Sequence, residues 1–137
     1  MSTEVIIAIV GAGLAILGVI TFLARRPRKD LNREYFQKKW RELQKQLGKP
    51  ETWPMAIIQA DNLLDEALRK RRFKGKTMGE RMVAAQRSFT NNDRVWFGHK
   101  LRNKLVHEVD TKVSKKDIKE AMLGFGQALK DVGALKK

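Results

Sequence analysis

The segment HKLRNKLVHE, from His99 to Glu108, holds the side chains best suited to proton transfer beside an anion. Arg102 and Asn103 are adjacent, and His107 follows Arg102 by five positions. Histidine side chains ionise near neutral pH and act there as acid or base. An arginine guanidinium stays charged and forms paired hydrogen bonds with phosphate oxygens. With Asn103 able to bond the phosphate or the histidine ring, this pattern indicates a phosphate site with acid–base chemistry.

The five-residue spacing alone does not bring the side chains of Arg102 and His107 together on a straight helix. On a regular helix, residues five apart lie about 140° apart around the axis. A bend, a helix end at His107, or a symmetric dimer with motifs from both chains would make them converge. The competing interpretation is structural: Lys100, Arg102 and Lys104 are solvated charges, and His107 caps the helix where the dipole favours a cation.

Three further side chains are candidates for supporting this site. Asp61 and Asp65 are four residues apart, on one face of a predicted helix. One of them pairs with Arg102 across the fold and fixes its guanidinium, or they are surface acids that balance Arg69; both interpretations stay open. His99 lies at the start of the motif segment and is the third candidate.

The composition excludes most other catalytic classes. The chain has no cysteine and two histidines, so it offers no thiol nucleophile, no disulfide and no histidine-rich metal cage. No glycine-rich loop follows a strand, and no Ser-His-Asp triad is arranged. We therefore predict no metal site and no small-molecule cofactor.

Apolar spacing predicts an all-α chain with five helices after residue 30 and no strand. These helices span about residues 31–47, 53–72, 77–87, 90–107 and 114–132. Their predicted N-terminal residues are Thr52, Thr77, Thr90 and Ser114. Helical spacing favours packing over base stacking for the large aromatic residues Trp40, Trp53, Trp96 and Phe97.

The N-terminal residues 5–24 are uncharged and long enough to cross a hydrocarbon core of about 30 Å. A cleaved signal peptide needs a basic start and a small-residue cleavage site, and the sequence has neither. The positive-inside rule places residues 1–4 outside and residues 31–137 in the cytoplasm, as a single-pass protein of the inner (cytoplasmic) cell membrane. The linker 25–30 is predicted to bind anionic lipid through its basic residues, Arg25, Arg26, Arg28 and Lys29.

The formal net charge is +14, and every Lys and Arg lies after residue 24. Such an excess in a small domain attracts polyanions, either nucleic acid or anionic lipid headgroups. Charge alone does not choose between these partners.

The motif and its surroundings resemble the HEPN superfamily. The R-x-x-x-x-H motif has Asn directly after Arg, and the helix QADNLLDEALRKR and the turn FKGKTMGERM precede the motif helix. The resemblance covers about residues 53–132. It implies a HEPN-like helical bundle that pairs as a homodimer, and a metal-independent endoribonuclease in which Arg102 and His107 act on RNA with help from Asn103. The alternatives are a non-catalytic module that binds RNA, anionic lipid or a partner protein, and a structural dimer scaffold.

Overall fold

The computed structural model describes residues 2–24 and 30–137, and this part of the chain is all-helical, without strands. Its α-helices are α1 (Thr3–Ala24), α2 (Arg33–Lys45), α3 (Trp53–Lys70), α4 (Met78–Ala85), α5 (Asn92–His107) and α6 (Lys115–Asp131). Short 3₁₀ turns follow α2, precede α3 and follow α4. The five helices predicted after residue 30 are therefore confirmed.

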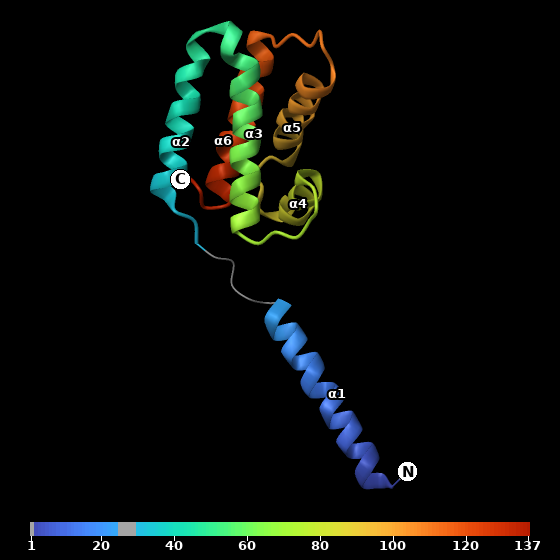
Figure 1. The fold of residues 1–137 in the computed structure, drawn as a ribbon. Helices are drawn as coiled ribbons and strands as arrows, with labels where there is room; N and C mark the ends of the chain where they lie inside the picture. The colour runs from blue at the N-terminus through green and yellow to red at the C-terminus, as the bar shows by residue number, and fades with distance from the viewer. Residues whose placement is uncertain (1, 25–29) are drawn as a thin grey trace.

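Helix α1 stands apart from the other helices (Figure 1). Its stretch Thr3–Thr21 has a mean hydropathy of 2.4 and none of it is buried. By length and composition it is the one helix in the described residues that is able to cross a membrane; an N-terminal signal sequence meets the same two criteria. The basic residues Arg25, Arg26, Arg28 and Lys29, predicted to bind lipid, lie outside the described residues.

Helices α2 to α6 form a bundle around α3, which packs against α2, α4, α5 and α6 (Figure 1). The predicted stripes face this core, and the residues of the last helix confirm it most fully: Ile118, Met122, Phe125, Leu129 and Val132 are all buried. On the other side, α2 buries Phe36 against the core, and the Tyr35 hydroxyl donates to both Glu66 oxygens at 2.9 and 3.0 Å. This hydrogen bond to the Glu66 carboxylate raises the pKa of Tyr35.

Three of the four predicted residues occupy the N-cap position of their helix, two of them with a side-chain cap, and the fourth does not. Ser114 and Asp117 form a full capping box at the start of α6, and the Thr77 hydroxyl accepts from the Glu80 amide at the start of α4. The prediction of Thr90 as a cap is wrong: Asn91, a better capping residue, accepts from the Arg94 amide instead.

Thr90 bonds to the end of α6, through its amide and hydroxyl to the Asp131 carboxylate at 2.7 and 2.8 Å. Thr52 occupies the N-cap position of α3, as predicted, but makes no side-chain cap, because its hydroxyl donates to the Gln46 and Lys49 carbonyls. In both places a tertiary or turn contact takes the side chain that the local pattern assigned to a helix start.

Helices α5 and α6 approach closely because glycines lie between them. A Cβ added at Gly124 would lie 2.6 Å from the Arg94 carbonyl oxygen, and one at Gly98 would lie 2.8 Å from the Phe125 ring. We expect Gly124→Ala to lower the free energy of unfolding by about 1–3 kcal/mol, because a backbone atom must move to admit the methyl group. Chemical denaturation followed by circular dichroism measures this loss, with Gly48→Ala, which meets nothing within 4 Å, as the matched control.

Candidate functional site

Three side chains of α5 share the face that packs toward α3. His99, Arg102 and Asn103 are at positions i, i+3 and i+4, which brings them together on one side of a helix. Across from them on α3 lies Asp61, a buried charged residue with 2% of its surface exposed. The structure thus brings Asp61, His99, Arg102 and Asn103, four of the predicted site residues, into one cluster.

These four side chains form a closed ring of polar contacts. The His99 Nδ1 lies 2.8 Å from Asp61 Oδ1, and the Arg102 Nε lies 3.5 Å from Asp61 Oδ2. The Arg102 Nη1 donates to Asn103 Oδ1 at 3.1 Å, and the Asn103 amide nitrogen lies 3.5 Å from His99 Nε2. Each member of the cluster therefore fixes two others.

The directions of these bonds assign the tautomer of the His99 ring. The Asp61 carboxylate accepts, so the Nδ1 atom of His99 carries the proton. Because the Asn103 oxygen accepts from Arg102, its NH₂ group faces the His99 Nε2. Nε2 then holds a lone pair, and the ring is held by Asp61 on one side and Asn103 on the other.

Burial makes this ring of contacts energetically important. Asp61 is almost fully enclosed and His99 is 8% exposed, with the Trp96 ring edge-on at 5.7 Å between centroids. A buried carboxylate is tolerated when cations and hydrogen bonds surround it. His99 and Arg102 supply these partners, so the interpretation that Asp61 pairs with Arg102 matches the structure.

Asp65 has the second of the two roles considered for these acids, which is to balance neighbouring cations such as Arg69. Its carboxylate accepts from the Arg81 Nε at 2.6 Å and Nη2 at 3.0 Å, a paired contact that ties α4 to α3. Arg69, four residues on, lies 3.6 Å away. Both cations balance the Asp65 charge, so it leaves little negative potential toward its neighbours.

A cavity of about 450 Å³ opens over the cluster. It is lined by Asp61, Asn62, Asp65, Thr77, Met78, Gly79, His99, Arg102 and Asn103. Residues 77 to 79 are the N-terminal cap and first positions of α4, whose leading amides have no acceptor inside the helix. The positive end of α4 and the Arg102 guanidinium therefore border the same space, an arrangement that attracts anions.

The Arg102 guanidinium keeps hydrogen-bonding capacity. Its Nε is buried and makes no hydrogen bond in the described part of the chain, because Asp61 lies at ion-pair rather than hydrogen-bond geometry. One of its N–H groups is used on Asn103. The Nη donors that Asn103 does not use are available for two oxygens of an anion such as phosphate.

His107 lies apart from the cluster. It is the last residue of α5, is exposed, and does not line the cavity. The helix ends there, as one interpretation of the spacing required, yet the histidine ring that Asn103 approaches is that of His99. Val106 and Val109, on either side of His107, are exposed apolar residues.

Sequence reasoning named His99 only as a support and missed the contribution of α4. The i, i+3, i+4 spacing of His99, Arg102 and Asn103 was visible in the sequence, whereas the choice of Asp61 rather than Asp65 as the acid that faces Arg102 was not. No group of three or more His, Cys, Asp or Glu residues in the described chain is arranged to hold a metal ion.

Comparisons with protein-family models, curated proteins and solved structures found no match.

Proposed function

We propose that this protein is a membrane-anchored, HEPN-like, metal-independent endoribonuclease. The observation that supports it best is the ring of Asp61, His99, Asn103 and Arg102 beside the α4 N-terminus, which holds an arginine with free donors at a cavity. Phosphate is the anion that such a fork and helix end suit. The net charge of +14 favours a polyanionic substrate.

In the proposed reaction, a ribose 2′-OH attacks the adjacent phosphorus. A base takes the hydroxyl proton, an acid protonates the leaving 5′ oxygen, and the products are a 2′,3′-cyclic phosphate and a 5′-OH end. Arg102 binds the phosphate oxygens, where negative charge develops. His107 transfers the proton, and Asp61, His99 and Asn103 position Arg102.

His107 reaches the phosphate of a second copy in this proposal. It lies five positions after Arg102, so the two side chains point about 140° apart on α5. A symmetric pair of chains places the His107 of each copy near the Arg102 of the other. The exposed Val106 and Val109 beside His107 supply apolar surface for this contact.

Helix α1 is proposed to span the membrane, with the bundle in the cytoplasm. Its uncharged residues 5–24 support the span, and the basic residues that follow it support the orientation. The anchor brings the bundle to the compartment that holds RNA. It also confines chains to a plane, which raises their effective concentration for pairing.

Cleavage of single-stranded RNA by the full chain in detergent with EDTA tests this proposal. We expect His107→Ala to reduce the rate at least about 100-fold without loss of thermal stability, because the side chain is exposed. Lys45→Ala, which removes an exposed charge at the end of α2, is the matched control and should cleave normally. If the unmodified chain binds RNA in a salt-sensitive way but does not cleave it, the proposal of endoribonuclease activity is contradicted.

Mixing two inactive variants tests the shared site. In a pair of one Arg102→Ala chain and one His107→Ala chain, one of the two sites keeps both residues. Random pairing should then restore about one quarter of the unmodified activity. No recovery would show that each chain uses its own histidine.

A further inference from the structure

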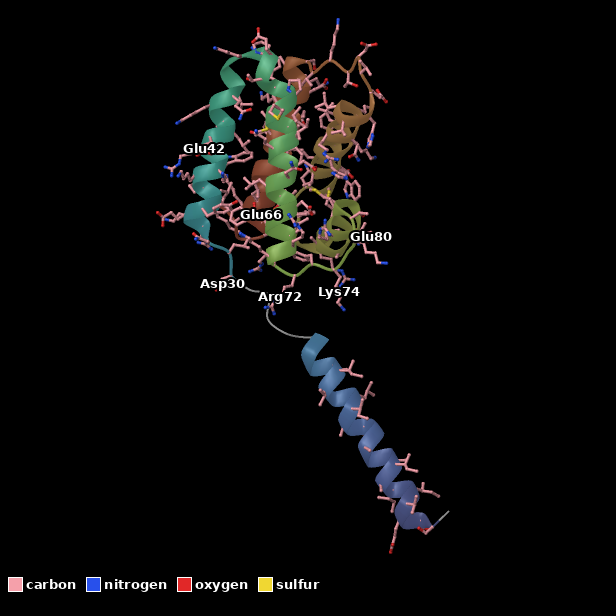
Figure 2. All side chains as sticks on the ribbon, in the orientation of Figure 1. Asp30, Glu42, Glu66, Arg72, Lys74 and Glu80 are labelled. Carbon is pink, nitrogen blue, oxygen red and sulfur yellow. The ribbon has the colours of Figure 1, made fainter. Side chains whose placement is uncertain are left out.

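The end of the bundle at which the chain arrives from α1 is marked by Asp30. This residue lies 3.7 Å from the Arg71 guanidinium, just after α3. Figure 2 shows Arg72 and Lys74 at the same end of the bundle as Asp30. The turn between α3 and α4 is therefore the part of the bundle beside the anchor connection.

This turn is strongly basic. Residues 69–76 include six Lys and Arg and no acid. The first three pair with acids: Arg69 with Asp65, Lys70 with Glu66 and Arg71 with Asp30. The other three are exposed and form no ion pair within residues 2–24 and 30–137: Arg72, Lys74 and Lys76. These three cations form a positive surface, which we call the basic turn; at its edge the Glu80 carboxylate accepts from the Lys76 amide at 2.6 Å.

The backbone of the basic turn is held in place. The Phe73 amide donates to the Leu68 carbonyl at 3.0 Å, which closes the end of α3, and the Phe73 side chain is buried. Further along, the Arg81 Nη1 donates to the Gly75 carbonyl at 2.8 Å. The three cations are therefore presented from a fixed surface.

Arg72 occupies a position that glycine usually fills. Its φ is 63°, in the left-handed region where a side chain carries a conformational cost. The chain has a cation there despite that cost. An exposed positive side chain therefore lies where the chain turns away from the end of α3.

The connection to α1 is short. Five residues, 25–29, separate Ala24 from Asp30, so the two ends lie no more than about 20 Å apart. The basic turn begins directly after Arg71, which pairs with Asp30, and it is thus confined near the end of α1. Attraction to an anionic surface acts over a Debye length of about 8–10 Å.

We propose that Arg72, Lys74 and Lys76 bind the anionic lipid headgroups of the membrane that α1 crosses. This inference rests on the proposed span. The docked basic turn fixes the orientation of the bundle, and the cavity residues Thr77 to Gly79 follow it directly in the chain. The cavity then opens near the membrane surface, and its substrate is recruited there.

Energy transfer from a dye on the bundle to headgroup-labelled lipid in nanodiscs tests the docking. The chain has no cysteine, so Glu34→Cys, at the exposed start of α2 beside the Asp30 end of the bundle, and Glu51→Cys, at the opposite end beyond α2, each give a unique dye position and leave the three cations in place. We expect higher transfer from position 34 in phosphatidylglycerol-containing discs than in phosphatidylcholine discs. Position 51 should show a smaller difference, and 1 M salt should abolish the effect.

Charge reversal supplies the matched comparison. Each basic residue near an anionic surface raises the docked-to-free ratio about fivefold. Arg72→Glu with Lys76→Glu should therefore lower that ratio at least about 25-fold, and Lys45→Glu with Lys49→Glu should leave it unchanged. A chain that enters the discs but shows equal transfer in both lipids contradicts the docking alone. A chain that does not co-purify with the discs contradicts the span and the docking together.

Discussion

Replacing Asp61 with alanine is expected to lower the free energy of unfolding by about 3–5 kcal/mol. Asp61 is 2% exposed and bonds to His99 Nδ1 at 2.8 Å, with the Arg102 Nε 3.5 Å from its second oxygen. Its removal leaves a buried imidazole donor without an acceptor and an arginine without its counter-charge. Chemical denaturation of the full chain, followed by helical circular dichroism and tryptophan fluorescence, measures the loss.

An exposed acid and a double-mutant cycle separate this effect from a general loss of charge. Asp110→Ala removes an exposed carboxylate between α5 and α6 and should change stability by less than about 0.5 kcal/mol. In a cycle with His99→Ala, the Asp61 and His99 losses should be strongly non-additive, because the residues share one contact. Equal losses for Asp61→Ala and Asp110→Ala would contradict the importance of the buried ring.

The helices could be predicted from the sequence because their signals are local. The stripe of Ile118, Met122 and Phe125, and the Ser114–Asp117 capping box, depend on residues within a few turns of each other. Thr90 could not be interpreted in this way. Its partner, Asp131, is 41 residues away, and only the packed bundle brings the two together.

In the candidate site, too, the local features were predictable and the tertiary contacts were not. The motif helix was predictable, and the pairing of an acid with Arg102 was one of the two interpretations that residue types and helical spacing left open. Which acid makes the contact was not predictable: Asp61 and Asp65 share a helix face, yet one meets Arg102 and the other meets Arg81 and Arg69. The register of α3 against α5 decides this, and that register depends on the whole core.

The position of α4 is also a tertiary result. In the sequence, GKTMGER lacks the strand and spacing of a phosphate loop. In the fold, the start of this helix nonetheless borders the cavity beside Arg102. Helix dipoles and leading amides act on whatever lies in front of them, so this contribution depends on position rather than on motif.

Replacing Arg102 with lysine is expected to reduce RNA cleavage about 100-fold while leaving the bundle folded. Lysine keeps the positive charge beside Asp61, so the buried carboxylate retains a cation. Lysine lacks the planar guanidinium of Arg102. That group donates to Asn103 Oδ1 and has further parallel donors for a phosphate. The loss should therefore fall on stabilisation of the transition state, where one donor contributes a factor of about 100 or more.

Single-turnover cleavage rates, together with thermal unfolding of the same samples, measure this division between chemistry and stability. Arg94→Lys is the matched control, because Arg94 is on the same helix, pairs with Glu120 at 3.3 Å and does not line the cavity. It should leave cleavage unchanged. If Arg102→Lys cleaves as fast as the unmodified chain, charge alone is sufficient and the guanidinium geometry has no catalytic role. If it unfolds instead, the guanidinium is needed for the buried ring, and the expectation that the bundle stays folded is contradicted.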